Sequence, residues 1–208
     1  MLRVNRLGLV ALVLLLAAAG GCIFSPPDVP PCTDCNPTQK LQFPDSEDKL
    51  MANFQYIYET MDYQEFRKML GHNYITVLQQ STRNTFPDVG ETFDLEEELR
   101  IHERMFSKQD VYDPNNVAVP GVQTIQFNTF QRVGVWLTSP ANDRIPNARS
   151  ALYSVQFLFD RGATYSILKV TGNIQFYVTS RDSTVGGVTK PYFQMVGQID
   201  LTDDPPAK

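Results

Sequence analysis

A glutamate and a histidine that stand one helical turn apart are the residues of this chain best suited to proton transfer. Glu98 and His102 are four positions apart in a segment with the apolar spacing of an amphipathic helix. Their side chains should therefore project from the same helix face. A carboxylate beside an imidazole can carry out general acid–base catalysis. The alternative is a histidine at the edge of the core, satisfied by one hydrogen bond, beside a solvated glutamate.

The other patterns that could bind metal or carry out catalysis are incomplete. His102 and Glu103 begin the pattern of a zinc-protease helix, but the second histidine, four residues later, is missing. Cys32 and Cys35 have the spacing of a redox or zinc motif, yet the strand-to-helix context and two further ligands are absent. A local disulfide or two free thiols is expected instead. The sequence predicts no metal and no cofactor.

Composition indicates one folded domain rather than a disordered or nucleic-acid-binding chain. The 208 residues are 42% hydrophobic and 20% charged, with a formal net charge of −5. Without the two arginines of residues 1–21 the net charge becomes −7. An acidic surface with no cluster of Lys and Arg argues against nucleic acid as a partner.

Helices are expected early in the chain. Helix signals place one helix at residues 46–60, a short one at 62–70 and a third at 95–107, where Asp94 and Glu97 form a capping box. Alternating residues predict a strand at 73–80 between the second and third helices. The inner stripe of the third helix is Leu95, Leu99, His102 and Phe106.

Long antiparallel strands are expected later, at residues 125–137, 151–160, 165–179 and 191–201. Strict alternation predicts one face toward the helices, made by Ile125, Phe127, Thr129, Val133, Val135 and Leu137. The same counting predicts an outer apolar face made by Phe130, Trp136, Leu152, Leu158 and Tyr177. That outer face is a candidate interface with a second copy or another protein. The alternative is scattered exposure, or cover by the loops at residues 80–92 and 108–120.

The N-terminal residues have the sequence pattern of an export signal. Arg3 and Arg6 precede an apolar run that is shorter than a membrane span, and small residues close it at Cys22. The segment Ala19-Gly20-Gly21-Cys22 resembles the lipobox of bacterial lipoproteins, although Ala19 replaces the usual leucine. The alternatives are an ordinary signal peptide or a single anchor helix.

The lipobox resemblance implies acyl chains such as palmitate on Cys22, and several chains anchor a protein stably. It divides the chain into a signal peptide (1–21), a Pro-rich tether (22–45) and a domain (46–208). The domain would face the periplasm or the cell exterior. Because Ile23 is not the aspartate that retains some lipoproteins at the inner membrane, the outer membrane is favoured.

The order helix, short helix, strand, helix and four strands resembles the NTF2-like, or cystatin-like cone, superfamily. The resemblance covers roughly residues 46–202 and includes local echoes at 62–70 and 197–201, although the last strand lacks a tryptophan that many relatives carry. It implies an α+β fold in which helices pack in the concave face of a curved antiparallel sheet and enclose an apolar pocket. Relatives use such a pocket for isomerisation or dehydration, for ligand binding, or not at all.

The expected function is a lipid-anchored extracytoplasmic binding or interaction module without catalytic activity. Tyr74, His102 and Tyr153 are the candidate pocket residues for a small apolar ligand. The alternative is a pocket enzyme, of isomerase or dehydratase type, that uses Glu98 and His102 for acid–base chemistry. A cavity beside His102 is the feature that the enzyme requires.

Overall fold

The computed structural model describes residues 41–85, 88–113 and 115–202. The predictions for the signal peptide, for Cys22 and for the pair Cys32 and Cys35 lie outside the described residues. In the described part, no helix is both long and apolar enough to span a membrane.

The helices begin and end where the sequence places capping residues. In α2 (Glu47–Thr60) the Ser46 side chain accepts a hydrogen bond from the Lys49 N–H, and Met61, at φ 55°, ends the helix. Asp62 caps α3 (Tyr63–Met69) in the same way. The capping box predicted for α5 (Leu95–Phe106) is present. One short helix, α4 (Gln80–Thr85), lies in a segment predicted to be a loop; it buries none of its side chains.

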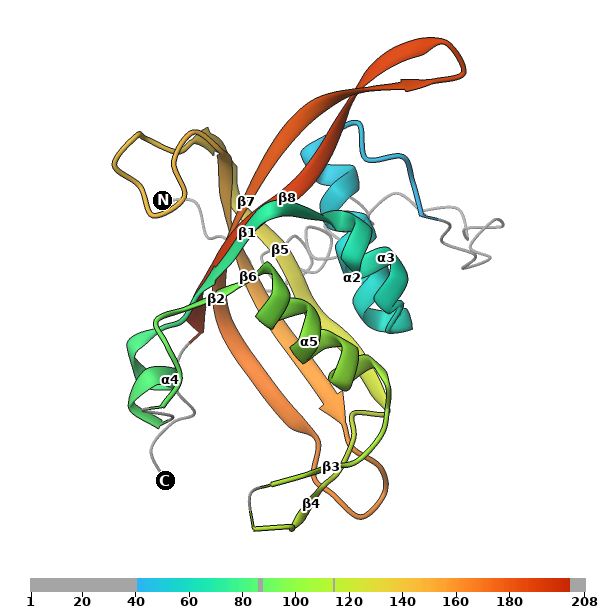
Figure 1. Cartoon of the computed structure of the whole chain (residues 1–208), viewed down its shortest axis with the longest axis vertical. Coiled ribbons are helices and arrows are strands. Elements are labelled where there is room, and N and C mark those ends of the chain that lie inside the picture. Colours follow the sequence, from blue (N-terminus) through green and yellow to red (C-terminus); the bar gives the residue numbers. More distant parts are fainter. Residues whose placement is uncertain (1–40, 86–87, 114, 203–208) are drawn as a thin grey trace, which may run out of the picture. The chain divides into compact units, whose positions relative to one another are not determined.

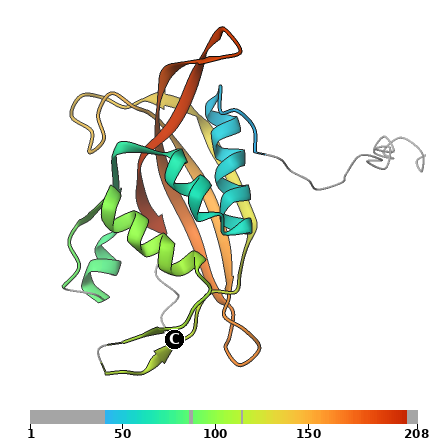
Figure 2. The same cartoon turned by 45° about the vertical axis from the view of Figure 1, so that its right-hand side comes forward.

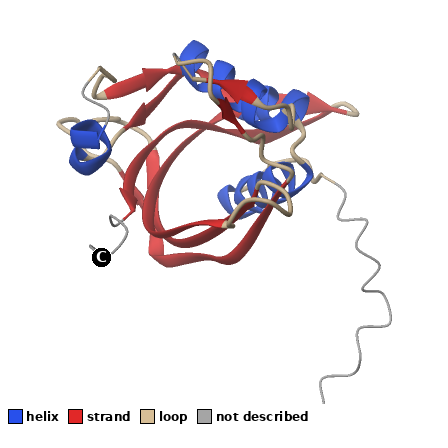
Figure 3. Ribbon diagram, turned by 90° about the horizontal axis from the view of Figure 1, so that it is seen from below, coloured by secondary structure: helices blue, strands red, loops and turns tan. Residues whose placement is uncertain are grey.

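Six strands form one sheet in the order β2 (Thr92–Asp94), β1 (Leu70–Val77), β8 (Val188–Thr202), β7 (Leu168–Val185), β6 (Arg149–Asp160) and β5 (Thr124–Thr138). β1 and β8 run parallel, and the other neighbours run antiparallel. A separate hairpin joins β3 (Val111–Tyr112) to β4 (Ala118–Val119). Figures 1 and 3 show that the sheet is curved and that α2, α3 and α5 lie on one side of it.

The core lies between the helices and the concave face of the sheet. Leu50, Phe54 and Ile57 of α2 and Phe66 of α3 are at most 2% exposed and pack against buried strand residues such as Phe176. Burying large apolar side chains on both layers is the main source of stability for such an arrangement. The predicted α+β class, with helices packed in the concave face of a curved, mainly antiparallel sheet, is confirmed.

Residues 41–45 also pack on this unit, although the sequence assigns them to the tether. Asn53 exchanges two hydrogen bonds with the backbone of Gln42, at 2.9 and 2.7 Å, and the Phe193 N–H donates to the Pro44 carbonyl. The Phe43 ring lies 5.6 Å from the ring of Tyr192. The packed unit therefore begins before Ser46.

A β-bulge in β5 reverses the predicted orientation of half of that strand. In the register with β6, Phe127 lies opposite Phe157 and Thr129 lies opposite Gln156. Asn128 is therefore an extra residue with no residue opposite it on β6. One extra residue exchanges the two faces for every residue that follows. A second irregularity follows between Val133 and Leu137.

The bulge corrects two of the predicted faces. Phe130 and Trp136 pack against the helix-side core instead of facing outward. The residues predicted to face the helices, Val133, Val135 and Leu137, are 50%, 67% and 62% exposed. The predicted orientation is therefore wrong for β5 beyond Asn128, and it is right for Ile125 and Phe127, which lie in the core.

Tyr177 does lie on the outer side of the sheet, but it is only 1% exposed because the loop between β5 and β6 covers it. It forms a second apolar cluster with Ile145, Ala148 and Val196, and its hydroxyl donates to Asp143 at 3.0 Å. Leu152 and Leu158 remain half-buried. The continuous five-residue outer patch predicted from the sequence is therefore not formed, and a homodimer through this face stays a prediction.

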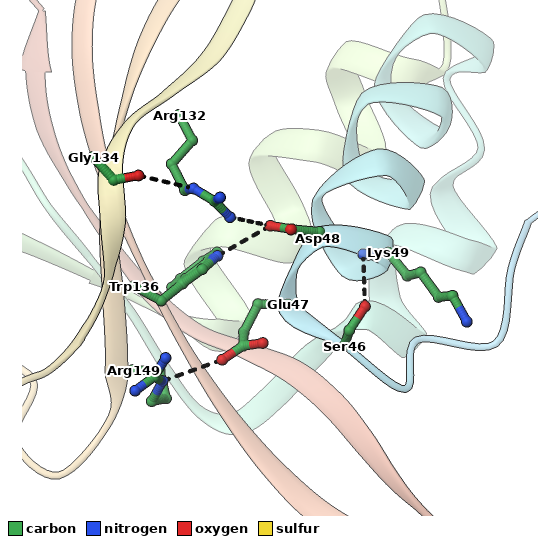
Figure 4. Close-up of polar contacts among 8 residues, drawn as sticks. All are labelled: Ser46, Glu47, Asp48, Lys49, Arg132, Gly134, Trp136 and Arg149. Atoms are coloured by element: carbon green, nitrogen blue, oxygen red, sulfur yellow. Dashed lines mark hydrogen bonds and ion pairs between the residues drawn. The ribbon is translucent and has the colours of Figure 1, made fainter.

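Polar contacts fix the start of α2 against the sheet, as Figure 4 shows. The Asp48 carboxylate accepts hydrogen bonds from Arg132 and, at 3.2 Å, from the Trp136 indole N–H. Glu47 pairs with Arg149 of β6 at 3.1 Å. These contacts set the position of the helix whose inner face carries Phe54 and Tyr58 toward the pocket described below.

Candidate functional site

An apolar pocket of about 280 Å³ lies between α5 and the strands that face it. Tyr58, Thr76, Glu98, His102 and Thr202 supply its buried polar side chains, and the half-buried Gln198 and Asp200 of β8 also line it. The remaining lining is apolar: Phe54, Leu78, Phe93, Ile101, Met105, Phe157, Phe159, Val170 and Ile174. An apolar cavity with a few convergent polar groups is the usual form of a small-molecule site.

The sequence of α5 explains why Glu98 and His102 reach this pocket. Asp94 and Glu97 fix the first turn, and the apolar stripe of the helix then packs against the core. Glu98 and His102 lie on the same side as that stripe, so they are only 3% and 5% exposed. The sequence predicted this shared inward face for His102 but left Glu98 open to solvent in one interpretation, and that interpretation is wrong.

Both ring nitrogens of His102 have partners inside the fold. Its Nδ1 lies 3.0 Å from the Glu98 backbone carbonyl, and its Nε2 lies 2.5 Å from the Tyr58 hydroxyl. The ring also stacks on Phe66, with centroids 4.0 Å apart. Burial lowers the pKa of His102 to about 4, although the carbonyl contact opposes this shift. A neutral imidazole that donates from Nδ1 to the Glu98 carbonyl and accepts at Nε2 from the Tyr58 hydroxyl satisfies both hydrogen-bond partners.

The Glu98 carboxyl group is only partly satisfied. Its Oε2 accepts a hydrogen bond from the Thr76 hydroxyl at 2.9 Å. Its Oε1 has no hydrogen bond to a described residue and lies 3.5 Å from His102 Nδ1. Burial raises the pKa of Glu98 to about 7, and the nearby hydroxyl groups of Thr76 and Tyr74 oppose this shift. Near neutral pH the carboxyl group can therefore either donate or accept a hydrogen bond.

Two buried tyrosines complete the polar network. Burial, with the nearby Glu98, raises the pKa values of Tyr58 and Tyr74 well above their usual range, so both keep their protons. The Tyr74 hydroxyl lies 3.1 Å from the Thr76 hydroxyl. Since the Thr76 proton goes to Glu98, Tyr74 donates to Thr76. The chain of contacts runs from Tyr74 through Thr76 to Glu98.

The structure assembles only part of the predicted ligand-binding set. His102 lines the pocket, and Tyr74 joins it indirectly through Thr76. Tyr153 lies elsewhere in the core, with its ring 4.8 Å from Phe130 and 6.2 Å from Trp136. Burial raises its pKa to about 12. The prediction that Tyr153 lines the pocket is therefore wrong: the reversed half of β5 packs Phe130 and Trp136 onto that ring.

Sequence reasoning missed Tyr58, Thr76 and the group at the end of β8. Tyr58 falls within the helix predicted at residues 46–60 and Thr76 within the strand predicted at 73–80, and neither was given a functional role. A hydroxyl at a buried strand position is the one signal that could have indicated Thr76, because such a group needs a partner. In the described ranges no three His, Cys, Asp or Glu side chains gather in a way that could hold a metal ion.

A second hollow, an open groove of about 710 Å³, lies between α3, β1 and α5. Most of its lining is exposed and carries charges of both signs: Arg67, Arg100, Asp94, Glu96 and Glu103. The smaller pocket is the better candidate because its polar groups are buried and its carboxyl group has a strongly raised pKa.

No protein-family model matches the chain, and no curated protein matches its sequence. Solved structures that are similar include a conserved protein from Planctomyces limnophilus DSM 3776, with 10% identity, a TM-score of 0.44 and coverage of 75% of this chain and 92% of the other. AusH from Aspergillus nidulans has 11% identity, a TM-score of 0.43 and coverages of 78% and 89%. An NTF2-like protein from Cytophaga hutchinsonii ATCC 33406 has 9% identity, a TM-score of 0.35 and coverages of 72% and 89%. The arrangement described above, with helices in the hollow of a curved sheet, is the one that the NTF2-like resemblance implies.

Proposed function

We propose that this chain is a lipid-anchored extracytoplasmic module that binds a small, mainly apolar ligand in the pocket beside Glu98. The observation that supports it best is a buried carboxyl group, with one oxygen free of hydrogen bonds to described residues, on the wall of an apolar pocket. The anchor rests on the lipobox resemblance at Cys22.

The size of the pocket sets the size of the ligand. An apolar cavity of about 150 Å³ holds a benzene molecule. The pocket here, at about 280 Å³, suits a molecule of two fused rings or a branched chain of similar volume. Its apolar walls favour a hydrocarbon body, and Glu98 favours one hydrogen-bonding group on that body.

We favour binding as the function, and not acid–base catalysis by Glu98 with His102, because both nitrogens of the imidazole already have hydrogen-bond partners. Tyr58 and the backbone occupy its two nitrogens, and a pKa of about 4 keeps it neutral and weakly basic. His102 therefore positions its neighbours and has no free nitrogen to offer a ligand. A dehydratase mechanism would need that nitrogen.

Glu98 acting alone as a base is the second candidate function, favoured by a pKa of about 7. The probe would be 2-tetralone, a bicyclic ketone with acidic α-protons, in deuterated buffer. Faster α-deuteration by the native chain than by Glu98→Gln, followed by NMR, would support catalysis. Equal rates would refute catalysis by Glu98 and leave binding as the one proposed function.

Binding is tested by titrating residues 41–208 with 2-naphthol and following its fluorescence. Val170→Trp should fill the pocket and remove binding, whereas Val135→Trp, on a strand position that is 67% exposed, should leave it unchanged. Affinity should rise as the pH passes through about 7, because an ionised Glu98 is the stronger acceptor for the naphthol hydroxyl. Glu98→Gln should remove this pH dependence. Unchanged binding by Val170→Trp would refute the assigned pocket.

The anchor is tested separately on the full chain. Cys22→Ala should lose the acyl mass in intact-protein mass spectrometry and leave the membrane fraction. A native chain without acyl mass would refute the anchor and leave the pocket untouched.

A further inference from the structure

Exposed apolar side chains gather at one end of the domain. Fourteen large apolar residues are exposed in the described part of the chain, and seven of them lie in two short segments, so their placement is not scattered. One segment is the β3–β4 hairpin and the other is the loop from β6 into β7. We call these residues the apolar end: Val111, Tyr112, Val117, Val119, Tyr165, Ile167 and Leu168. Figures 1 and 2 place both segments at the same end of the sheet.

The backbone beneath the apolar end is held by specific contacts. The Gln123 N–H donates to the Asp160 carbonyl at 2.7 Å and so ties the segment after the hairpin to the end of β6. Asp110 accepts from the Gly121 N–H at 2.9 Å. In the β6–β7 loop, Arg161 donates to the Ser166 carbonyl at 3.1 Å and lies over the Tyr165 ring. The apolar side chains are thus presented outward from a fixed framework.

The elements that carry the apolar end also contribute residues to the pocket. Phe159 and Val170, on either side of the β6–β7 loop, both line the pocket. On α5, which leads into the hairpin, Ile101 lines the pocket and is 39% exposed. The strands and the helix that carry the apolar end therefore also carry part of the pocket lining.

The charges around the apolar end cancel. Lys108, Arg161 and Lys169 flank it together with Asp110, Asp113 and Asp160. The remainder of the chain is acidic, so the apolar end adds nothing to the net negative charge. Such a balance suits an electrically neutral surface better than a strongly charged protein.

We propose that the apolar end docks on the lipid bilayer to which the chain is anchored, with Tyr112 and Tyr165 at the depth of the headgroups. Tyrosine favours that depth because its ring is apolar and its hydroxyl is polar. The nineteen residues 22–40, if extended as their prolines predict, would reach about 60 Å, at about 3.1 Å per residue. A tether of that reach keeps the bilayer available to the domain at high effective concentration. The docking rests on the proposed anchor, and it would let the pocket take its ligand from the lipid phase.

The test attaches residues 22–208 to vesicles through Cys22, so it does not depend on acylation in the cell. Cys32→Ser and Cys35→Ser leave one thiol, which is coupled to a maleimide lipid in phosphatidylcholine vesicles. Tyr165→Trp then reports contact, because brominated phosphatidylcholine quenches tryptophan that enters the bilayer. Quenching of at least twofold is expected above the background of the chain without this substitution, which carries Trp136 alone.

Two matched pairs of substitutions identify the surface. Tyr112→Asp with Ile167→Asp should abolish the added quenching. Val185→Asp with Val188→Asp should retain it, because these residues are similarly exposed but lie at the tip of the β7–β8 hairpin, at the opposite end of the sheet (Figure 1). No added quenching, or equal quenching in both pairs, would overturn the proposal. Light scattering that shows residues 41–208 to be a dimer broken by the first pair would assign the apolar end to a second copy instead.

Failure of docking can be distinguished from failure of the pocket. The pair Tyr112→Asp and Ile167→Asp should still bind 2-naphthol, and Val170→Trp should lose 2-naphthol but keep the quenching. If Tyr112→Asp with Ile167→Asp lost both 2-naphthol binding and quenching while keeping a cooperative thermal transition, separate roles for the pocket and the apolar end would be contradicted.

Discussion

The buried pair Glu98 and His102 should make opposite and nearly equal contributions to the pH dependence of stability. Burial raises the pKa of Glu98 from an ordinary 4.5 to about 7 and lowers that of His102 from 6.5 to about 4. Between pH 4.5 and 6.5 the folded pair holds one proton, on Glu98. The unfolded pair also holds one proton, on His102. Because the number of bound protons is equal, this pair contributes no slope to stability in that window.

Removing either member should expose the effect of the other. The buried Glu98 carboxyl group is compatible with the fold while it is protonated, below pH 4.5. Its ionisation costs folding stability progressively as the pH rises from 4.5 to 7. Glu98→Gln should therefore gain stability relative to the native chain over that range. His102→Gln should lose relative stability as the pH rises from 4 to 6.5. Each pKa moves by about 2.5, and one pKa unit is about 1.4 kcal/mol, so each change should be about 3 kcal/mol.

Thermal unfolding of residues 41–208, followed by circular dichroism at several pH values, measures these differences. A change of about 3 kcal/mol corresponds to about 6 to 12 °C in Tm for a domain of this size. The doubly substituted chain should run parallel to the native one between pH 4.5 and 6.5. A charged ion pair in the fold would reverse both slopes, and parallel curves for all variants would show that neither group is shifted. Either result would refute the reasoning.

Three further predictions concern the packing that holds the pocket, and each is checked by urea unfolding. Asp48→Ala should lower the unfolding free energy by about 1 kcal/mol, because its carboxylate accepts hydrogen bonds from both Arg132 and Trp136, whereas Asp45→Ala, which removes one i,i+4 pair with Lys49, should have the smaller effect. Gly197→Ala should cost about 2 kcal/mol, because a Cβ there would meet the Ile75 carbonyl at 2.5 Å, whereas Gly90→Ala, with 3.5 Å to the nearest atom, should cost less than about 1 kcal/mol. Deleting Asn128 should cost about 4 kcal/mol or more by turning Phe130 and Trp136 out of the core, whereas Asn128→Ala should be nearly neutral; equal effects would contradict the bulge.

Local features of the fold could be read from the sequence because they depend on nearby residues. The caps Ser46, Asp62 and Asp94 and the inward stripe of α5 follow from spacings of three and four positions. The same spacing brought Glu98 and His102 together. These are contacts within one helix, where sequence distance sets spatial distance.

The remaining parts of the site depend on contacts between distant elements. Tyr58 reaches His102 from α2, and Thr76 reaches Glu98 from β1. No periodicity within either segment encodes these meetings. The bulge at Asn128 could not be predicted for a related reason. An extra polar residue in an alternating strand fits the local pattern, and only the pairing with the partner strand shows that the register has shifted.

The parallel pairing of β1 with β8 has a consequence for the order of folding. Leu70 pairs with Met195, so β1, the first strand of the chain, gains its parallel neighbour only when β8, the last strand, has formed. A chain that lacks its final strand would leave β1 with β2 alone as a partner and would leave β7 as a bare edge. Closing so long a loop makes folding slow and concerted. Truncation within β8 should therefore remove the parallel pairing that joins β1 and β2 to the remaining strands of the sheet.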